Sequence, residues 1–258
     1  MIDKLGLQLY TVYKHLNDED EIRKTFKSLK ELGYDEAETC GCEIDYGLFY
    51  DLAEEAGIKI IGAQAQYDLM KSDIESVIRE NKKLHVNDVG VGGFDTRSEE
   101  EVKGFIEYAN KIAKRFGEEG LKFTYHNHNH EFIRFPNGKC TMDMLLEEFD
   151  PENTSFVLDT CWVQHAGCDV CSWIEKMSGR IDIVHLKDLT MERDWTNWGI
   201  PKAKVAAVGK GNMDFKRIIE ACEKAGVKHY CIELDNCPED YHDELKFISD
   251  YMHKNFMK

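Results

Sequence analysis

The chain has 258 residues, of which 42% are hydrophobic, and this is enough to form the core of one large α/β domain. Its formal net charge of -16 argues against a nucleic-acid partner, because phosphate backbones are bound by cationic surfaces. The nine cysteines are scattered and odd in number, which is typical of reduced thiols, and no apolar run approaches the ~18 residues that a membrane-spanning helix requires. We therefore expect a cytoplasmic protein that binds neither nucleic acid nor membrane.

Short apolar runs alternate along the chain with longer segments whose apolar residues recur at helical spacing. The predicted strands are Leu5–Tyr10, Tyr34–Glu38, Ile58–Ala65, Val86–Gly90, Leu121–His126, Thr154–Asp159, Ile181–Leu186 and His229–Leu234. The predicted helices are Asp20–Leu32, Ile44–Ala56, Ser72–Leu84, Glu99–Phe116, Met142–Phe149, Val170–Met177, one that contains Phe215 to Cys222, and Asp243–Phe256. Lys187–Asn212 is predicted to be a long loop that can act as a lid.

This alternation predicts a parallel sheet covered by helices. Eight strand and helix units over this length indicate a single-domain (β/α)8 TIM barrel that spans residues 1–258. The alternative is a doubly wound open sheet. The GxGxxG turn that dinucleotide-binding sheets of that type carry after their first strand is absent, since Leu5–Tyr10 leads directly into the first loop. The barrel is therefore the preferred fold.

Residues able to bind a metal stand at the ends of four consecutive predicted strands. They are His126, Asp159, His185 and Glu233 on the fifth to eighth strands. Each alone has an ordinary structural explanation, such as a turn cap or a solvated charge. Because the carboxyl ends of barrel strands meet at one face, the four together predict one site, and burying them there unpaired would be costly. Two imidazoles and two carboxylates suit one divalent ion, such as Mn2+, Co2+, Zn2+ or Mg2+.

The stretch TYHNHNHEF, which begins at Thr124, holds further residues suited to acid–base chemistry. His128 lies two positions beyond His126 and therefore shares its face of the strand. Glu131 lies beyond the strand and has to fold back to reach the same site. This stretch thus supplies one predicted ligand and two candidates for moving a proton.

Motifs along the whole chain carry a family resemblance. They are LGLQLY, YHNHNHEF, VLDTCW, VHLKDL, AAVGKGNMDF and CIELDN. In this order they resemble the sugar phosphate isomerase/epimerase family of xylose-isomerase-like TIM barrels, which includes ketose epimerases, hydroxypyruvate isomerase, inosose and dehydroshikimate dehydratases, and apurinic endonucleases. The resemblance implies a single barrel domain and metal roles for Asp159, His185 and Glu233.

The chain departs from the family pattern at two places. On the fifth strand relatives read Glu-Asn-His where this chain has His126, Asn127 and His128. Either His126 or Glu131 then supplies the fourth ligand, and strand register favours His126. Ketose 3-epimerases of the family carry a histidine three residues after the sixth-strand aspartate, where this chain has Trp162. Epimerisation with two bases on opposite faces of the substrate is therefore not directly supported.

The leading functional hypothesis is a sugar or cyclitol isomerase or epimerase that removes a proton beside a carbonyl, through a metal-stabilised enediolate. His128 or Glu131 moves the proton, and Lys187 binds or protonates an oxygen. The alternative is a dehydratase or lyase that uses the same intermediate on a keto-sugar or keto-glycoside. A metal-dependent phosphodiesterase is disfavoured by the acidic net charge and by the small number of potential metal ligands on strands two to four. A non-catalytic sugar-binding barrel is disfavoured because the four potential metal ligands are present.

A carbohydrate ring is commonly bound against aromatic side chains. The candidates for such a wall are Tyr10, Tyr67, Trp162, Trp195 and Trp198, together with Gln8 as a further substrate contact. We therefore expect a small carbohydrate as the partner molecule. A homo-oligomer is compatible with a barrel of this type.

Overall fold

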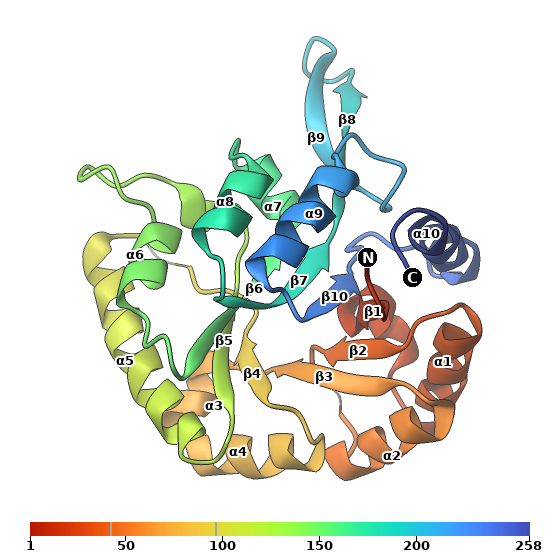
Figure 1. Ribbon diagram of the computed structural model, residues 1–258, viewed down its shortest axis with the longest axis horizontal. Helices are drawn as coiled ribbons and strands as arrows, with labels where there is room; N and C mark the ends of the chain where they lie inside the picture. Colours follow the sequence, from red (N-terminus) through yellow and green to blue (C-terminus); the bar gives the residue numbers. More distant parts are fainter. Residues whose placement is uncertain (42, 96) are drawn as a thin grey trace.

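Eight parallel strands close into a barrel, and helices lie around its outside (Figure 1). The computed structural model describes residues 1–41, 43–95 and 97–258. The barrel strands are β1 (Gly6–Gln8), β2 (Glu36–Thr39), β3 (Lys59–Gln64), β4 (Asp88–Val91), β5 (Lys122–His126), β6 (Thr154–Asp159), β7 (Ile181–Leu186) and β10 (His229–Ile232). Around the ring they follow the order β1-β10-β7-β6-β5-β4-β3-β2. The predicted TIM barrel is confirmed, and the open sheet is wrong.

Capping residues in the sequence mark where helices begin and end. Within the described residues the helical segments are η1 (Leu9–His15), α1 (Glu19–Glu31), α2 (Tyr46–Ala56), α3 (Tyr67–Ser72), α4 (Ile74–Lys83), α5 (Glu99–Gly117), η2 (His130–Phe132), α6 (Thr141–Glu148), α7 (Thr160–His165), α8 (Val170–Lys176), α9 (Phe215–Ala225) and α10 (His242–Asn255). Ser98 starts α5 by accepting a hydrogen bond from the Glu101 N–H at 3.2 Å. Gly57 ends α2 with a φ of 73°, a left-handed conformation that favours glycine. Among these helices none is both long and apolar enough to span a membrane.

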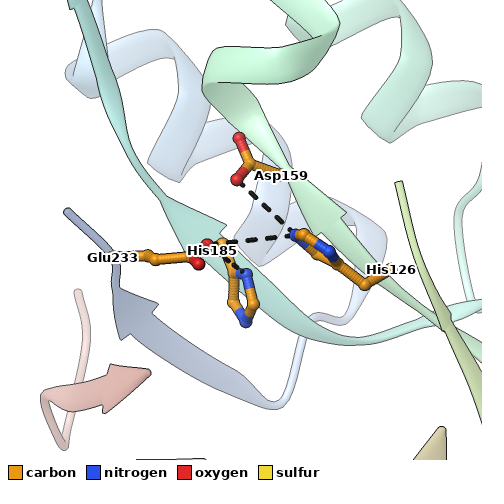
Figure 2. A group of neighbouring side chains, drawn as sticks. All are labelled: His126, Asp159, His185 and Glu233. Carbon is orange, nitrogen blue, oxygen red and sulfur yellow. Dashed lines mark ion pairs between the residues drawn. The ribbon is translucent and has the colours of Figure 1, made fainter. Parts of the chain in front are cut away.

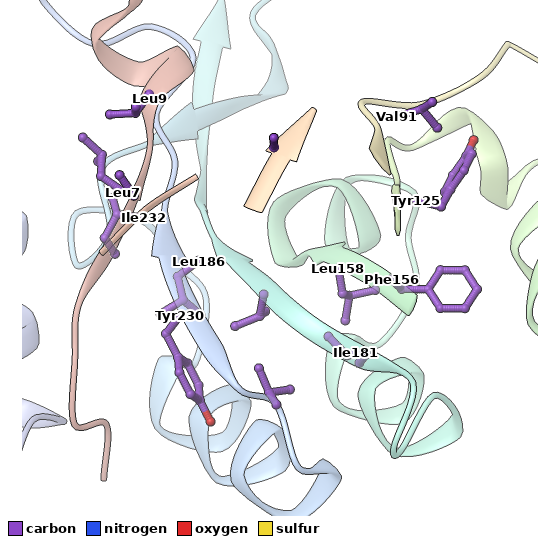
Figure 3. Close-up of a cluster of buried hydrophobic side chains, with 14 of the residues drawn as sticks. Leu7, Leu9, Val91, Tyr125, Phe156, Leu158, Ile181, Leu186, Tyr230 and Ile232 are labelled. Atoms are coloured by element: carbon purple, nitrogen blue, oxygen red, sulfur yellow. The ribbon is translucent and has the colours of Figure 1, made fainter. Parts of the chain in front are cut away.

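The main hydrophobic core joins alternate residues of the strands to the helices. Phe156 and Leu158 on β6 belong to it, as do Tyr230 and Ile232 on β10 (Figure 3). Since successive side chains of a strand point to opposite faces, the residues between them point into the barrel. The outer positions therefore hold the helices, and the inner positions are available to a layered barrel interior.

A second, small hydrophobic cluster fills the middle of the barrel. It consists of Ile61, Val157, Ile183 and Cys231. Asp159, His185 and Glu233 each follow one of these residues by two positions and therefore point to the same side. The apolar cluster is thus the layer of the barrel interior directly below these three polar side chains.

The segment predicted as a long loop, Lys187–Asn212, instead contains an antiparallel hairpin. β8 (Asp188–Asp194) pairs with β9 (Ile200–Ala206), and Figure 1 shows the hairpin extending away from the barrel. The prediction was wrong because these strands are rich in polar residues. Their charges pair across the hairpin, as Lys204 Nζ does with Glu192 Oε2 at 3.4 Å.

Candidate metal centre

Four side chains from neighbouring strands converge at the carboxyl end of the barrel (Figure 2). His126 ends β5, Asp159 ends β6, His185 lies near the end of β7 and Glu233 directly follows β10. One potential ligand atom of each residue lies within 4.8 Å of the others, and all four residues are buried. The structure therefore brings together the four residues that the sequence predicts as ligands.

The converging atoms are two ring nitrogens and two carboxylate oxygens. His126 Nε2 lies 3.6 Å from Asp159 Oδ2 and 3.9 Å from Glu233 Oε2. His185 Nδ1 lies 2.8 Å from Glu233 Oε2. All four atoms are buried, and their close contacts are with one another and with the Lys187 ammonium, not well-aligned hydrogen bonds to other described residues. A divalent ion accepts this donor set, and the two carboxylates balance its charge, so the residues fit such an ion.

Lys187 adds a buried positive charge to this group. Its Nζ lies 2.9 Å from Asp159 Oδ2, 3.0 Å from Glu233 Oε2 and 2.9 Å from Asp235 Oδ1. Burial alone would lower the pKa of Lys187, but the three carboxylates raise it above its ordinary value. Burial alone would raise the pKa of Glu233, but His185 and Lys187 hold it well below its ordinary value. Both groups are therefore charged at neutral pH.

His185 contacts a second carboxylate on its other side. Its Nε2 lies 2.5 Å from Oε2 of Glu38, a buried residue of β2. Burial disfavours the protonated imidazolium form and by itself would lower the pKa of His185. The negative charges of Glu38 and Glu233 have the larger effect and raise this pKa to about 10. Glu38 was not among the residues predicted for this site. The available signal was the EAET pattern of β2, in which glutamates occupy a strand that is buried on both faces.

A cavity of about 390 Å³ opens beside the four residues. Its lining consists of Tyr10, Cys40, Gln64, Gly92, His126, His128, Lys187, Glu233 and Asp235. His128 contributes a buried Nδ1 that lacks a hydrogen-bond partner among the described residues. Burial, together with His126, lowers the pKa of His128 to about 3. A neutral imidazole and the Lys187 ammonium therefore face the same space. The lining residues that were not predicted for the site are Cys40, Gln64, Gly92 and Asp235.

Glu131 lies outside the group of four. Its Oε1 accepts a hydrogen bond from the Tyr125 hydroxyl, and its Oε2 accepts one from the His128 backbone N–H, both at 2.9 Å. The side chain is fully buried, and burial raises its pKa. Because both oxygens hold the loop that follows β5, the structure does not place Glu131 as a metal ligand or as a proton carrier.

Two predicted aromatic contacts lie at the site. Tyr10 lines the cavity, and the centre of the Trp162 ring lies 5.1 Å from Lys187 Nζ. Gln8 is buried, and its Oε1 accepts a hydrogen bond from the Tyr10 backbone N–H at 3.0 Å, which starts η1. The role of Gln8 visible in the structure is therefore to cap a helix.

Three other predicted aromatic contacts are placed elsewhere. Trp195 is 80% exposed and Trp198 is 98% exposed, because both lie in the turn of the projecting hairpin. The Tyr67 ring packs against Phe94 and Phe105, with ring centres 5.1 Å apart in each pair. None of these three side chains lines the cavity beside the four residues, so their role in a substrate wall stays a prediction.

The closed barrel and the buried His/Asp/His/Glu group define a TIM barrel with a candidate metal centre at the carboxyl ends of its strands. Comparison with known proteins agrees with this class. The chain belongs to the xylose isomerase-like TIM barrel family, whose model matches residues 50–251.

Individual relatives share parts of the sequence or the whole fold. An inosose dehydratase of Geobacillus thermodenitrificans is 27% identical over 197 residues, which cover 73% of this chain and 61% of the relative. The match thus spans about three fifths of that curated relative's length. A sugar phosphate isomerase/epimerase of Parabacteroides distasonis superposes with a TM-score of 0.82 at 24% identity, over 99% of this chain and 100% of that one. The IOLI protein, solved with a binding zinc atom, gives 0.73 at 16% identity, over 97% of each chain. At these identities the structural similarity concerns the fold.

Proposed function

We propose that this protein is a divalent-metal-dependent dehydratase that removes water from a cyclic polyhydroxy ketone of the inosose type. The observation that carries this proposal is the group of four buried ligand atoms beside a cavity that also contains His128 and Lys187. The relative named inosose dehydratase supports the reaction and the substrate class. The zinc atom of the IOLI protein supports the choice of a divalent metal.

The residues that would hold the metal are His126, Asp159, His185 and Glu233. The chemistry supplied by a bound divalent ion is Lewis-acid polarisation of the ketone, which makes the neighbouring C–H group more acidic. Because the four residues are buried, electrostatic interactions with the ketone oxygen would be stronger there than in bulk water. The pocket therefore favours removal of a proton from the carbon next to the ketone.

His128 and Lys187 divide the proton transfers. His128 is unprotonated at neutral pH, because its pKa is lowered to about 3, and its free Nδ1 accepts the proton from the carbon next to the ketone. The electron pair of that C–H bond forms a carbon–carbon double bond, and the C–O bond at the next carbon breaks. The Lys187 ammonium gives a proton to the departing hydroxyl, which leaves as water. Transfer of the proton from His128 to Lys187 through solvent restores both groups.

The arrangement favours dehydration over epimerisation. An epimerase that uses two bases needs a second acid–base group on the opposite face of the substrate. At the position where related 3-epimerases are expected to carry a histidine, this chain has Trp162, which does not titrate. Glu131 is committed to the loop after β5. Dehydration needs one base and one acid, and the cavity offers both.

The test is to incubate the metal-loaded protein with an inosose in deuterated water and to analyse the products by mass spectrometry and NMR. We expect a product lighter by one water molecule. A product of unchanged mass that carries deuterium beside the ketone would instead indicate isomerisation or epimerisation. Recovery of unlabelled starting material with every inosose tried would contradict the proposal.

A further inference from the structure

Glu38 reaches the candidate metal centre from a strand that contributes none of the four proposed ligands. It lies on β2, which is separated from β7 around the ring by β1 and β10. Its contact with His185 therefore crosses the interior of the barrel. The side chain is 1% exposed, so a carboxylate has been buried here in spite of the cost of desolvating it.

The contact between Glu38 and His185 determines how the imidazole faces the site. Nε2 of His185 lies against Glu38 Oε2, while Nδ1 of the same ring lies 2.8 Å from Glu233 Oε2, among the other proposed ligands. A ring whose Nε2–H donates to a carboxylate keeps its Nδ1 lone pair for a metal ion, and its basicity toward the ion increases. Held against Glu38 through Nε2, the His185 ring directs Nδ1 toward the other proposed ligands.

The second oxygen of Glu38 is also held. Gln64 Nε2 on β3 donates to Glu38 Oε1 at 3.4 Å, and Gln64 lines the cavity. Both oxygens of the Glu38 carboxylate are therefore held, Oε2 by His185 and Oε1 by Gln64. A side chain held in this way costs little entropy when it orients its neighbour.

We propose that Glu38 is a positioning residue of the metal centre, which aligns His185 Nδ1 with His126, Asp159 and Glu233. This inference rests on the proposed metal-dependent function, and it goes beyond that function by assigning to β2 a part in metal affinity. Residues that orient a metal-ligating histidine typically contribute about 10-fold to 100-fold to affinity.

The chain offers a matched control for this role. Glu36 lies two positions earlier on the same strand, is also buried, and places its Oε2 2.7 Å from His229 Nδ1. It is therefore a second carboxylate–imidazole pair that bridges strands of the barrel. His229 begins β10 and does not belong to the group of four, so this pair has the same chemistry without access to the metal.

The experiment is a calorimetric titration of Zn2+ into the metal-stripped chain of 258 residues, for the wild type, Glu38→Ala, Glu38→Gln and Glu36→Gln. We expect Zn2+ affinity to fall about 100-fold in Glu38→Ala and about 10-fold in Glu38→Gln, whose amide oxygen still accepts the Nε2–H but lacks the charge. Glu36→Gln should bind Zn2+ as the wild type does. The absorption spectrum of the Co2+-loaded protein should change in both Glu38 variants and stay unchanged in Glu36→Gln.

The outcomes separate this inference from the proposed function. If a folded Glu38→Ala binds Zn2+ as tightly as the wild type, Glu38 is not a positioning residue, although the metal site stands. If Glu38→Ala does not fold, wild-type affinity and an unchanged Co2+ spectrum in the nearly isosteric Glu38→Gln overturn the inference. An equal loss of affinity in Glu36→Gln also overturns it, because the effect would then be one of general stability. If the wild type itself binds no divalent ion, the proposed function fails.

Discussion

Two histidines of the candidate site, His185 and His128, have pKa values shifted in opposite directions. The pKa of His185 is raised to about 10 by Glu38 and Glu233, against the effect of burial, whereas burial and His126 lower that of His128 to about 3. At neutral pH without metal, His185 is therefore protonated and His128 is neutral. The first has to lose a proton before it binds an ion, and the second is already in the unprotonated form that a base requires.

Metal binding at neutral pH should consequently release about one proton from His185 per ion, because coordination requires a free Nδ1 lone pair. Affinity should rise with pH up to about 10. The stability of the metal-free protein should change in the opposite sense: a folded-state pKa above the ordinary 6.5 contributes stability that is complete below 6.5 and is lost as pH rises through 10. Calorimetric titrations in buffers of different ionisation enthalpy measure the proton count. Binding without proton release at pH 7 would contradict the proposed ligand role of His185.

Lys187 should have separate effects on binding and on turnover. In Lys187→Met the ammonium no longer repels an incoming dication or occupies Asp159 and Glu233, so divalent-ion affinity should rise by at least about 10-fold. Turnover should fall by about 100-fold or more, because the proton donor is lost. Parallel measurements of Zn2+ affinity and of kcat test both halves. Lys187→Arg serves as the control that keeps the charge. A variant with weaker metal binding and unchanged kcat would exclude the proposed role.

At the scale of elements, Asp188 joins the hairpin to the loop that precedes α9. Its carboxylate accepts backbone N–H groups of Leu189, Gly209, Gly211 and Met213 at distances of 2.8 to 3.2 Å. Close packing around it explains the glycine at position 211, where a Cβ atom would lie 2.2 Å from Asp188 Oδ1. The VGKGNMDF motif is thus a backbone cradle around one buried carboxylate.

Asp188→Ala should lower the free energy of unfolding by roughly 2–4 kcal/mol, because it leaves several backbone donors without their acceptor. Asp188→Asn should cost less, since its carbonyl oxygen still accepts while its NH2 group faces two donors. Urea unfolding followed by circular dichroism gives both values. Equal stability of Asp188→Ala and the wild type would show that water replaces the carboxylate without cost.

The exposed tryptophans of the hairpin should not contribute to the site of the same chain. Trp198→Ser and Trp195→Ser should each change the free energy of unfolding by less than about 0.5 kcal/mol, as is usual for exposed positions. Zn2+ affinity should also stay unchanged. Trp162→Phe is the comparison inside the site, and it should alter KM for the substrate. A large increase in KM for Trp198→Ser would show that the hairpin covers a cavity.

At the scale of the whole molecule, the sequence predicts the features that depend on the order of residues along one segment. The apolar stripe of α5 is buried as its helical spacing predicts, and the strict alternation of strands and helices led to the barrel. The convergence of His126, Asp159, His185 and Glu233 followed from one rule, that the carboxyl ends of barrel strands share a face.

The remaining features depend on contacts between distant segments. The pairing of Glu38 with His185 joins residues 147 positions apart and leaves no local pattern. The two strands of the hairpin are rich in polar residues. They are recognised as strands only from the structure, in which charges of β8 and β9 pair across the hairpin. Glu131 looked chemically competent in the sequence, and only the positions of Tyr125 and the His128 backbone reveal that its oxygens are already engaged.

The central claim is that the buried group holds a divalent ion on which dehydration depends. The most direct measurement is the rate at which metal-stripped protein dehydrates an inosose as Zn2+, Mn2+ or Co2+ is added in increments. The rate should rise from near zero and saturate at about one ion per chain, and Asp159→Asn should abolish this rise. Full activity of the stripped protein, or an undiminished response in Asp159→Asn, would contradict the claim.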